Sequence, residues 1–296
     1  MKVLLVGANG FVGKYLRREL EAHDYEVIGT DVVADDENIR IVDMLDTKAV
    51  DALVEEVKPD YIFNLAGQAA PSISWDKILL TMHLNVDISV NIVTACKKHC
   101  PKCRILLIGS ANQYDDSKAL DGVISETTPR NAASPYDVSK NAQEELMTLL
   151  AKKFDLDIMI TRSFNHIGPG QRTGFVVTDY SKRIVDLERG VIDTFTIGNL
   201  NAWKDFSDVR DVVRAYRLIA EKGTKGEIYN VGSGKSSYIR DLIGRLIELS
   251  DVAREKIALP ERLPDDALTH NRANIDKLKK ATGFEPQYDV ADTLES

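Results

Sequence analysis

Short apolar runs alternate with amphipathic helical segments through the first half of this chain, and this alternation most constrains its fold. Continuous apolar runs occupy 2–6, 25–30, 61–66, 105–109 and 157–162. Between the runs, apolar residues recur three or four positions apart, for example in 50–57. Strands that are apolar without a break are buried on both faces by the helices that connect them. We therefore predict an α/β fold with a doubly wound parallel sheet, which binds ligands beyond the carboxyl ends of its strands.

The second half of the chain is less regular. Glycine and proline gather in 168–174, whereas 227–234 again reads as a strand, and helical patterns follow at 238–249 and 276–282. We predict a larger domain and a smaller C-terminal lobe that binds substrate. The larger domain is assigned 1–165, joined again by 206–234, and the lobe is assigned 166–205 and 235–296.

Composition narrows the function classes. The 296 residues include 38 Lys and Arg against 46 Asp and Glu, a net charge of −8 without a basic run, so nucleic-acid binding is not expected. No apolar run approaches the roughly 20 residues that span a bilayer, so no membrane association is expected. The first ten residues carry too short an apolar run for a signal peptide, and we predict a cytoplasmic protein.

The segment Gly7–Gly13 (GANGFVG) lies directly after a predicted strand and opens a helix. Glycine at positions 7, 10 and 13 lets the backbone turn tightly and approach a pyrophosphate, which the helix N-terminus stabilises. Phe11 and Val12 begin that helix. These five residues are predicted to bind a dinucleotide.

Asp31 ends the second predicted strand, where a carboxylate accepts hydrogen bonds from both ribose hydroxyls and repels a 2′-phosphate. Val32 and Val33 provide no cation for that phosphate. NAD is therefore the predicted cofactor, with NADP kept as a second option.

Tyr136 and Lys140 lie four residues apart and so share one helix face. A neighbouring ammonium stabilises a phenolate, so we expect Lys140 to lower the pKa of Tyr136. Ser110 ends the strand at 105–109, where its hydroxyl can hydrogen-bond a carbonyl oxygen that Tyr136 protonates. These three are the predicted catalytic residues.

The three cysteines, Cys96, Cys100 and Cys103, have a spacing that some iron–sulfur enzymes use. However, Cys96 and Cys100 have helical spacing and Pro101 ends that helix, whereas thiolate clusters need a loop that wraps the metal. We predict reduced thiols and no metal site.

With these motifs, the chain resembles the extended short-chain dehydrogenase/reductases, the NAD-dependent epimerase/dehydratase family. The resemblance also rests on 43–46 (DMLD), 64–70 (NLAGQAA), 135–140 (PYDVSK) and 227–234 (EIYNVGSG). It implies that the larger domain is an NAD-binding Rossmann domain. It implies that Asp43 and Met44 flank the adenine, that Leu65, Ala66 and Gly67 line the cofactor, and that Lys140 also contacts the nicotinamide ribose.

Two further segments, 162–177 and 197–216, are similar to the GDP-4-dehydro-6-deoxy-D-mannose reductases and less closely to the GDP-mannose 4,6-dehydratases. This similarity implies that Asn165 and Val176 contact the nucleotide-sugar and that Arg262 holds its diphosphate. Lys204 is also predicted to bind the substrate's diphosphate; it stands where relatives carry arginine, and a lysine offers a point charge in place of a bidentate fork.

Dehydration needs an acid and a base beside the catalytic hydroxyl, and in the family these carboxylates directly follow the position of Ser110. Ala111 and Asn112 stand there, which favours simple reduction. We therefore predict an NAD(P)H-dependent reductase of the C4 ketone of a GDP-4-dehydro-6-deoxyhexose, giving GDP-D-rhamnose from the D-mannose derivative. A nucleotide-sugar 4-epimerase, a GDP-mannose 4,6-dehydratase and a non-catalytic NAD-sensing module are the alternatives.

The resemblance also implies a homodimer, formed through the helices near 86–98 and at Tyr136. Relatives continue past the last predicted helix, so we expect a shortened C-terminus.

Overall fold

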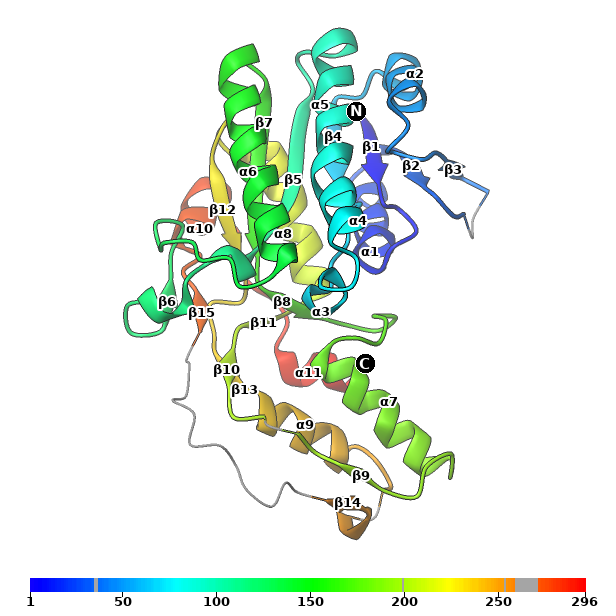
Figure 1. Cartoon of the computed structure of the whole chain (residues 1–296), viewed down its shortest axis with the longest axis vertical. Coiled ribbons are helices and arrows are strands. Elements are labelled where there is room, and N and C mark those ends of the chain that lie inside the picture. Colours follow the sequence, from blue (N-terminus) through cyan, green and yellow to red (C-terminus); the bar gives the residue numbers. More distant parts are fainter. Residues whose placement is uncertain (35–36, 199, 253, 259–270) are drawn as a thin grey trace.

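The computed structural model describes residues 1–34, 37–198, 200–252, 254–258 and 271–296. At its centre is a seven-stranded sheet in the order β12-β7-β5-β4-β1-β2-β3 (Figure 1). The strands are β1 (Lys2–Val6), β2 (Glu26–Asp31), β3 (Ile39–Ile41), β4 (Tyr61–Asn64), β5 (Arg104–Ser110), β7 (Asp157–Ser163) and β12 (Ile228–Val231). All neighbours in this sheet are parallel. The predicted doubly wound Rossmann sheet is confirmed.

Helices cover both faces of the sheet. In Figure 1, α5 (Ile88–His99) and α6 (Pro135–Phe154) lie in front of it, with α1 (Phe11–Glu21) and α8 (Val209–Lys222) behind. The helix α2 (Thr47–Val57) packs beside α5. Alternate residues of β1 enter two different cores, because successive strand side chains point to opposite faces. This two-sided burial explains why the strands are continuously apolar.

A smaller lobe lies below the carboxyl ends of the strands in Figure 1. It contains α7 (Val176–Glu188), α9 (Ile239–Glu248), α11 (Val290–Glu295) and three short strand pairs. The pairs are β8 (Asn165–Ile167) with β11 (Phe206–Asp208), β9 (Phe195–Thr196) with β14 (Ile257–Ala258), and β10 (Trp203–Lys204) with β13 (Ser237–Tyr238). An apolar core of its own joins α7 to α9.

The remaining elements connect these layers. They are the helices α3 (Pro71–Ser74), α4 (Ile78–Met82) and α10 (Asp276–Thr282), a π-helical segment (His83–Asp87), three 3-10 turns (Ala111–Gln113, Asp116–Lys118, Arg254–Lys256), and the strand pair of β6 (Val123–Ile124) with β15 (Arg272–Ala273). The helix α10 packs against α8 and β12 of the larger domain. The division of the chain into a domain of 1–165 with 206–234 and a lobe of 166–205 with 235–296 stays a prediction.

A buried carboxylate joins the lobe to the larger domain. Asp205 lies between β10 and β11 and has no solvent exposure. It accepts hydrogen bonds from the backbone N–H groups of Ser233 (2.8 Å), Gly234 (2.9 Å) and Ala273 (3.0 Å). Three segments distant in sequence therefore share one acceptor, which fixes the lobe beneath the sheet.

One helical stretch in the described part of the chain, Ile78–His99, is long and apolar enough to cross a membrane by length and composition alone. The expectation that no apolar run approaches such a length is wrong on this point, because α4, the π-helical segment and α5 form one continuous helix. Its residues Ile88, Ile92 and Val93 belong to the apolar core between the sheet and the helices α2, α5 and α6. A core helix passes the same test of length and hydropathy.

Candidate active site

The turn from β1 into α1 contains glycines at positions where a side chain would collide with neighbouring backbone. Gly7 has a φ of +83°, and a Cβ on it would lie 2.9 Å from the backbone nitrogen of Ala66. A Cβ on Gly13 would lie 2.2 Å from the carbonyl oxygen of Gly7. Gly10 is the N-cap residue of α1 and provides no side chain, so the first N–H groups of Phe11 and Val12 face out of the helix end. Such an end fits a pyrophosphate.

Asp31 lies at the carboxyl end of β2, beside this turn. Its two carboxylate oxygens accept hydrogen bonds from the backbone N–H groups of Asn9 (3.0 Å) and Val32 (2.8 Å). The carboxylate is thus held at the place where a ribose would follow the pyrophosphate. Val32 and Val33 are both exposed and bring no cation to it.

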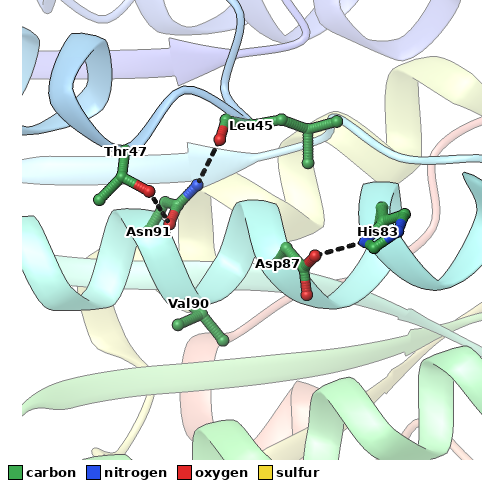
Figure 2. Close-up of a pocket in the computed structure, with 6 residues that line it drawn as sticks. All are labelled: Leu45, Thr47, His83, Asp87, Val90 and Asn91. Atoms are coloured by element: carbon green, nitrogen blue, oxygen red, sulfur yellow. Dashed lines mark hydrogen bonds and ion pairs between the residues drawn. The ribbon is translucent and has the colours of Figure 1, made fainter.

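The segment of Asp43 and Met44 is held from the side by α5. The side-chain amide of Asn91 donates to the carbonyl oxygens of Met44 (3.0 Å) and Leu45 (3.3 Å), the second of which is drawn in Figure 2. Thr47 donates in turn to the Asn91 oxygen (3.1 Å). A hollow of about 460 Å³ beside them is lined by Leu45, Thr47, His83, Asp87, Val90 and Asn91 (Figure 2). Met44 is buried, whereas Asp43 is exposed and accepts a hydrogen bond from the Leu45 N–H through one carboxylate oxygen (2.9 Å).

The loop after β4 brings the predicted cofactor residues next to the predicted catalytic lysine. A Cβ on Gly67 would lie 2.5 Å from Asn85 Oδ1 and 3.9 Å from Lys140 Nζ. The Gly7 turn, in its turn, touches the backbone of Leu65 and Ala66. The glycine turn, this loop and Lys140 therefore form one continuous cradle, and the donor set fits a dinucleotide.

Ser110 ends β5, while Tyr136 and Lys140 lie one turn apart on α6. Ser134 caps that helix and Pro135 starts it, which fixes where its first turn begins. All three side chains are less than a tenth exposed, at 8%, 6% and 7% respectively. The Ser110 hydroxyl is near enough to the phenol of Tyr136 to favour its ionised form. The structure thus brings the three predicted catalytic residues together at the carboxyl edge of the sheet.

The electrostatics of this group differ from the prediction. Burial raises the pKa of Tyr136 to about 12, although the nearby Ser110 hydroxyl opposes the rise. Burial also lowers the pKa of Lys140 to about 8. The ammonium donates to the carbonyl oxygen of Ile108 (2.8 Å) and to Gln143 Oε1 (3.2 Å). The expected lowering of the Tyr136 pKa is therefore wrong: burial is the main cause of its shift, and Lys140 is not among the groups that lower it.

A chain of buried polar residues, which the sequence analysis missed, supports Ser110. Gln113 Oε1 accepts from the backbone N–H of Ser110 (2.9 Å), and its amide donates to Glu144 Oε2 (3.1 Å). Arg162 from β7 donates twice to Glu144, at 2.8 and 2.6 Å. Glu144 lies four residues after Lys140, so the helical spacing that links Tyr136 and Lys140 is the signal that points to it.

The predicted substrate residues lie where the lobe meets the sheet. Asn165 begins β8 and donates to the carbonyl oxygen of Asp205 (3.2 Å), and Val176 begins α7. Lys204 on β10 forms an ion pair with Asp116 at 2.9 Å. Arg262 lies outside the described residues. The diphosphate role predicted for Lys204 therefore competes with a carboxylate already bound to it.

His166 has a structural place in this loop. Its ring stacks on that of Phe11 with centroids 6.3 Å apart, and its Nδ1 lies 3.1 Å from the carbonyl oxygen of Phe164. Burial lowers its pKa. A neutral ring that packs the start of α1 against β8 follows from these contacts.

Replacing Glu144 with Gln should destabilise the fold strongly, because it leaves the buried guanidinium of Arg162 without its carboxylate. We expect a loss of about 3 kcal/mol in the free energy of unfolding. The matched control is Glu145→Gln, since Glu145 is exposed and its ion pair in the described structure is with Arg130. That control should cost less than about 1 kcal/mol. Equal losses in denaturant unfolding of the two variants would contradict the role given to Glu144.

Comparison with known proteins agrees with the dinucleotide-binding site described above. The family model of the NAD dependent epimerase/dehydratase family matches residues 3–232. GDP-6-deoxy-D-mannose reductase of Pseudomonas aeruginosa is 28% identical over 99% of this chain and 94% of its own length. UDP-glucose 4-epimerase of Mycolicibacterium smegmatis is 27% identical over 99% of this chain and 96% of its own. The solved structure of RMD from Pseudomonas aeruginosa complexed with NADPH superimposes with a TM-score of 0.85, at 28% identity, over 99% of this chain and 96% of that one.

The family match covers the whole sheet, and the motifs that carried the resemblance lie together in the structure. The predictions of an enzyme and of a nicotinamide dinucleotide cofactor, NAD or NADP, are confirmed at the level of the family. This chain belongs to the NAD-dependent epimerase/dehydratase family and is an NAD(P)-dependent oxidoreductase within it.

Proposed function

We propose that this enzyme reduces the C4 ketone of a GDP-4-dehydro-6-deoxyhexose, converting GDP-4-dehydro-6-deoxy-D-mannose to GDP-D-rhamnose. The observation that carries the proposal is the composition of the catalytic edge. Ser110, Tyr136 and Lys140 are buried together there, while Ala111 and Asn112 follow Ser110 in a 3-10 turn. This set can protonate an oxygen, but the turn brings no carboxylate for removing a C5 proton. The GDP-6-deoxy-D-mannose reductase of Pseudomonas aeruginosa supports the choice of sugar.

The cofactor residues in this proposal are the glycine turn with Phe11 and Val12 for the pyrophosphate, Asp31 for a ribose, Asp43 and Met44 for the adenine, and 65–67 for the nicotinamide half. When bound, the reduced nicotinamide supplies the hydride for C4. The chain's own residues do the rest. Ser110 donates a hydrogen bond to the ketone oxygen and orients it, and Tyr136 gives its proton to that oxygen as the alcohol forms.

Lys140 provides a positive charge at this site when it is protonated. Its ammonium lies beside Gly67, where it can bind a ribose hydroxyl, and it is protonated below its pKa of about 8. In its protonated form it can give that hydroxyl a charge-assisted hydrogen bond. The high pKa of Tyr136, about 12, keeps the phenol protonated at the start of each reduction.

The rate of reduction should therefore decline on the alkaline side through Lys140 and not through Tyr136. As the pH rises through about 8, Lys140 loses its proton while Tyr136 keeps its own, so kcat/KM for the ketone should fall. In Lys140→Arg the cation stays charged at that pH, so the surviving activity should lack this decline. The same decline in both proteins would show that another group titrates.

Cofactor and substrate are tested together by mixing the enzyme with GDP-4-dehydro-6-deoxy-D-mannose and either NADH or NADPH. We expect the absorbance of the reduced cofactor to fall, and faster with NADH, because Asp31 repels a 2′-phosphate. Tyr136→Phe should lower kcat by about a hundredfold or more. No consumption of either cofactor would overturn the proposal. Redox-neutral interconversion of nucleotide-hexoses by protein that retains NAD would favour a 4-epimerase, and conversion of GDP-mannose to the ketone would favour a dehydratase.

We also propose a homodimer, in which a second copy covers one apolar face. The face is formed by α3, α4 and α6, with α4 packed against α6. Its exposed apolar side chains are Ile73, Trp75, Ile78, Leu79, Leu80, Val138 and Leu149. So many large apolar groups on adjoining helices are typical of an interface. The cytoplasmic location expected from the sequence stays a prediction.

The dimer is tested by sedimentation equilibrium. Leu79 is 74% exposed on α4, so Leu79→Asp should leave the monomer folded and shift the population from dimer to monomer. Leu120 is 82% exposed outside this face, and Leu120→Asp serves as the matched control that should stay dimeric. A wild-type protein that sediments as a monomer at micromolar concentration would exclude the interface.

A further inference from the structure

All three cysteines of the chain lie together at the far end of α5, away from the site described above. Their sulfur atoms all lie within 4.8 Å of one another. Cys96 and Cys103 are 1% and 3% exposed, whereas Cys100 is partly exposed. The whole thiol content of the protein is therefore one cluster, buried on two sides and open to solvent on the third.

The backbone builds this cluster with a return that helical spacing alone does not reveal. The last helical hydrogen bond runs from Cys100 N–H to the Cys96 carbonyl oxygen (2.9 Å), and α5 ends at His99. Pro101 begins a turn that is closed by the bond from Cys103 N–H to the Cys100 carbonyl oxygen (2.9 Å). The turn carries Cys103 back beneath the helix end. Helical spacing alone therefore does not exclude a metal here, because the turn brings Cys103 next to Cys96 and Cys100.

The size of the cluster suits one ion. Thiolates bind zinc at about 2.3 Å, so two of them on one tetrahedral ion stand about 3.8 Å apart. Sulfur atoms within 4.8 Å of each other reach that separation by closing about 1 Å or less. An iron–sulfur cluster holds its cysteines at separate irons and so needs them farther apart. The cluster is too tight for that role.

The surroundings favour a cation over free thiolates. The cluster lies at the C-terminus of α5, where unpaired carbonyl groups make the potential negative. Cys96 and Cys103 belong to the apolar core between the sheet and the helices α2, α5 and α6. The neighbouring imidazole of His99 is engaged by Asp51 on α2, with Nε2 and Oδ1 3.0 Å apart. The open side at Cys100 therefore leaves solvent as the source of a fourth ligand.

We propose that Cys96, Cys100 and Cys103 bind one thiophilic d10 cation, Zn²⁺ or Cu⁺, in a three-thiolate site completed by solvent. Sulfur ligands of this kind select such soft cations. The ion ties the end of α5 to the start of β5, because Cys103 directly precedes Arg104. Ser110 lies at the other end of β5, about 20 Å away for a strand of this length. The site is thus structural and independent of the proposed reduction.

The test is a metal titration of the full-length, fully reduced protein under anaerobic conditions. Cd²⁺ serves as the spectroscopic probe, since thiolate-to-metal charge transfer gives ultraviolet absorption that oxygen and nitrogen ligands do not give. We expect saturation at one equivalent. Competition with chromophoric chelators then measures the affinity for Zn²⁺ and for Cu⁺ in separate arms, and the tighter arm identifies the preferred ion.

Because the chain has three cysteines in total, any such band must come from this cluster. Cys100→Ser and Cys103→Ser should each weaken binding by about a hundredfold or more. Lys102→Ala, an exposed change in the same turn, is the matched control and should leave binding unchanged. Circular dichroism checks that each variant is folded, and a thermal shift on adding Zn²⁺ should appear in the wild type and be lost in both serine variants.

Three outcomes would overturn the site. The first is a titration without a charge-transfer band. The second is binding that Cys103→Ser does not weaken while the variant remains folded. The third is saturation at half an equivalent, which would place the ion between two molecules. Ketone reduction is measured in parallel, and its failure with an intact metal titration would count against the proposed function alone.

Discussion

The buried ion pair between Glu144 and Arg162 holds the catalytic edge together. Glu144 is on α6 with Tyr136 and Lys140, Arg162 is near the end of β7, and both side chains are about 5% exposed. Breaking a buried pair is costly because the remaining charge has no solvent to replace its partner. The pair therefore fixes the rotation of α6 about its axis relative to the sheet. Through Gln113, the same carboxylate also fixes the backbone of Ser110.

Burial of the predicted catalytic groups has two opposite effects on their pKa values, and both suit the proposed reduction. It raises the pKa of the phenol of Tyr136, which keeps the proton to be donated. It lowers the pKa of Lys140 into the range where its charge becomes sensitive to the solution. Desolvation disfavours the charged form of each group, and the two groups carry charge in opposite protonation states. One physical cause thus sets both values, and the spacing of four residues on a helix sets their proximity.

The sequence alone predicted the features that local pattern controls. The parallel sheet followed from uninterrupted apolar strands, and the Gly7–Gly13 turn and the pair of Tyr136 and Lys140 followed from motifs that span one turn each. What it missed depends on contacts between distant segments. Asn91 on α5 holds the Met44 backbone, and the return turn before Cys103 closes the thiol cluster. The predicted direction of the Tyr136 pKa shift was wrong because the depth to which a side chain is buried is a property of the packed molecule.

A net charge of −8 must be reconciled with ligands that carry pyrophosphates. At the proposed cofactor site, backbone N–H groups at the start of α1 provide positive potential for a pyrophosphate without requiring a charged side chain. At the substrate end Lys204 already carries Asp116 as a partner. If Lys204 binds a diphosphate as predicted, we expect that anion to compete with Asp116 for the ammonium. Under the proposed function, selection at this end would then be an exchange between two anions and would not depend on net charge.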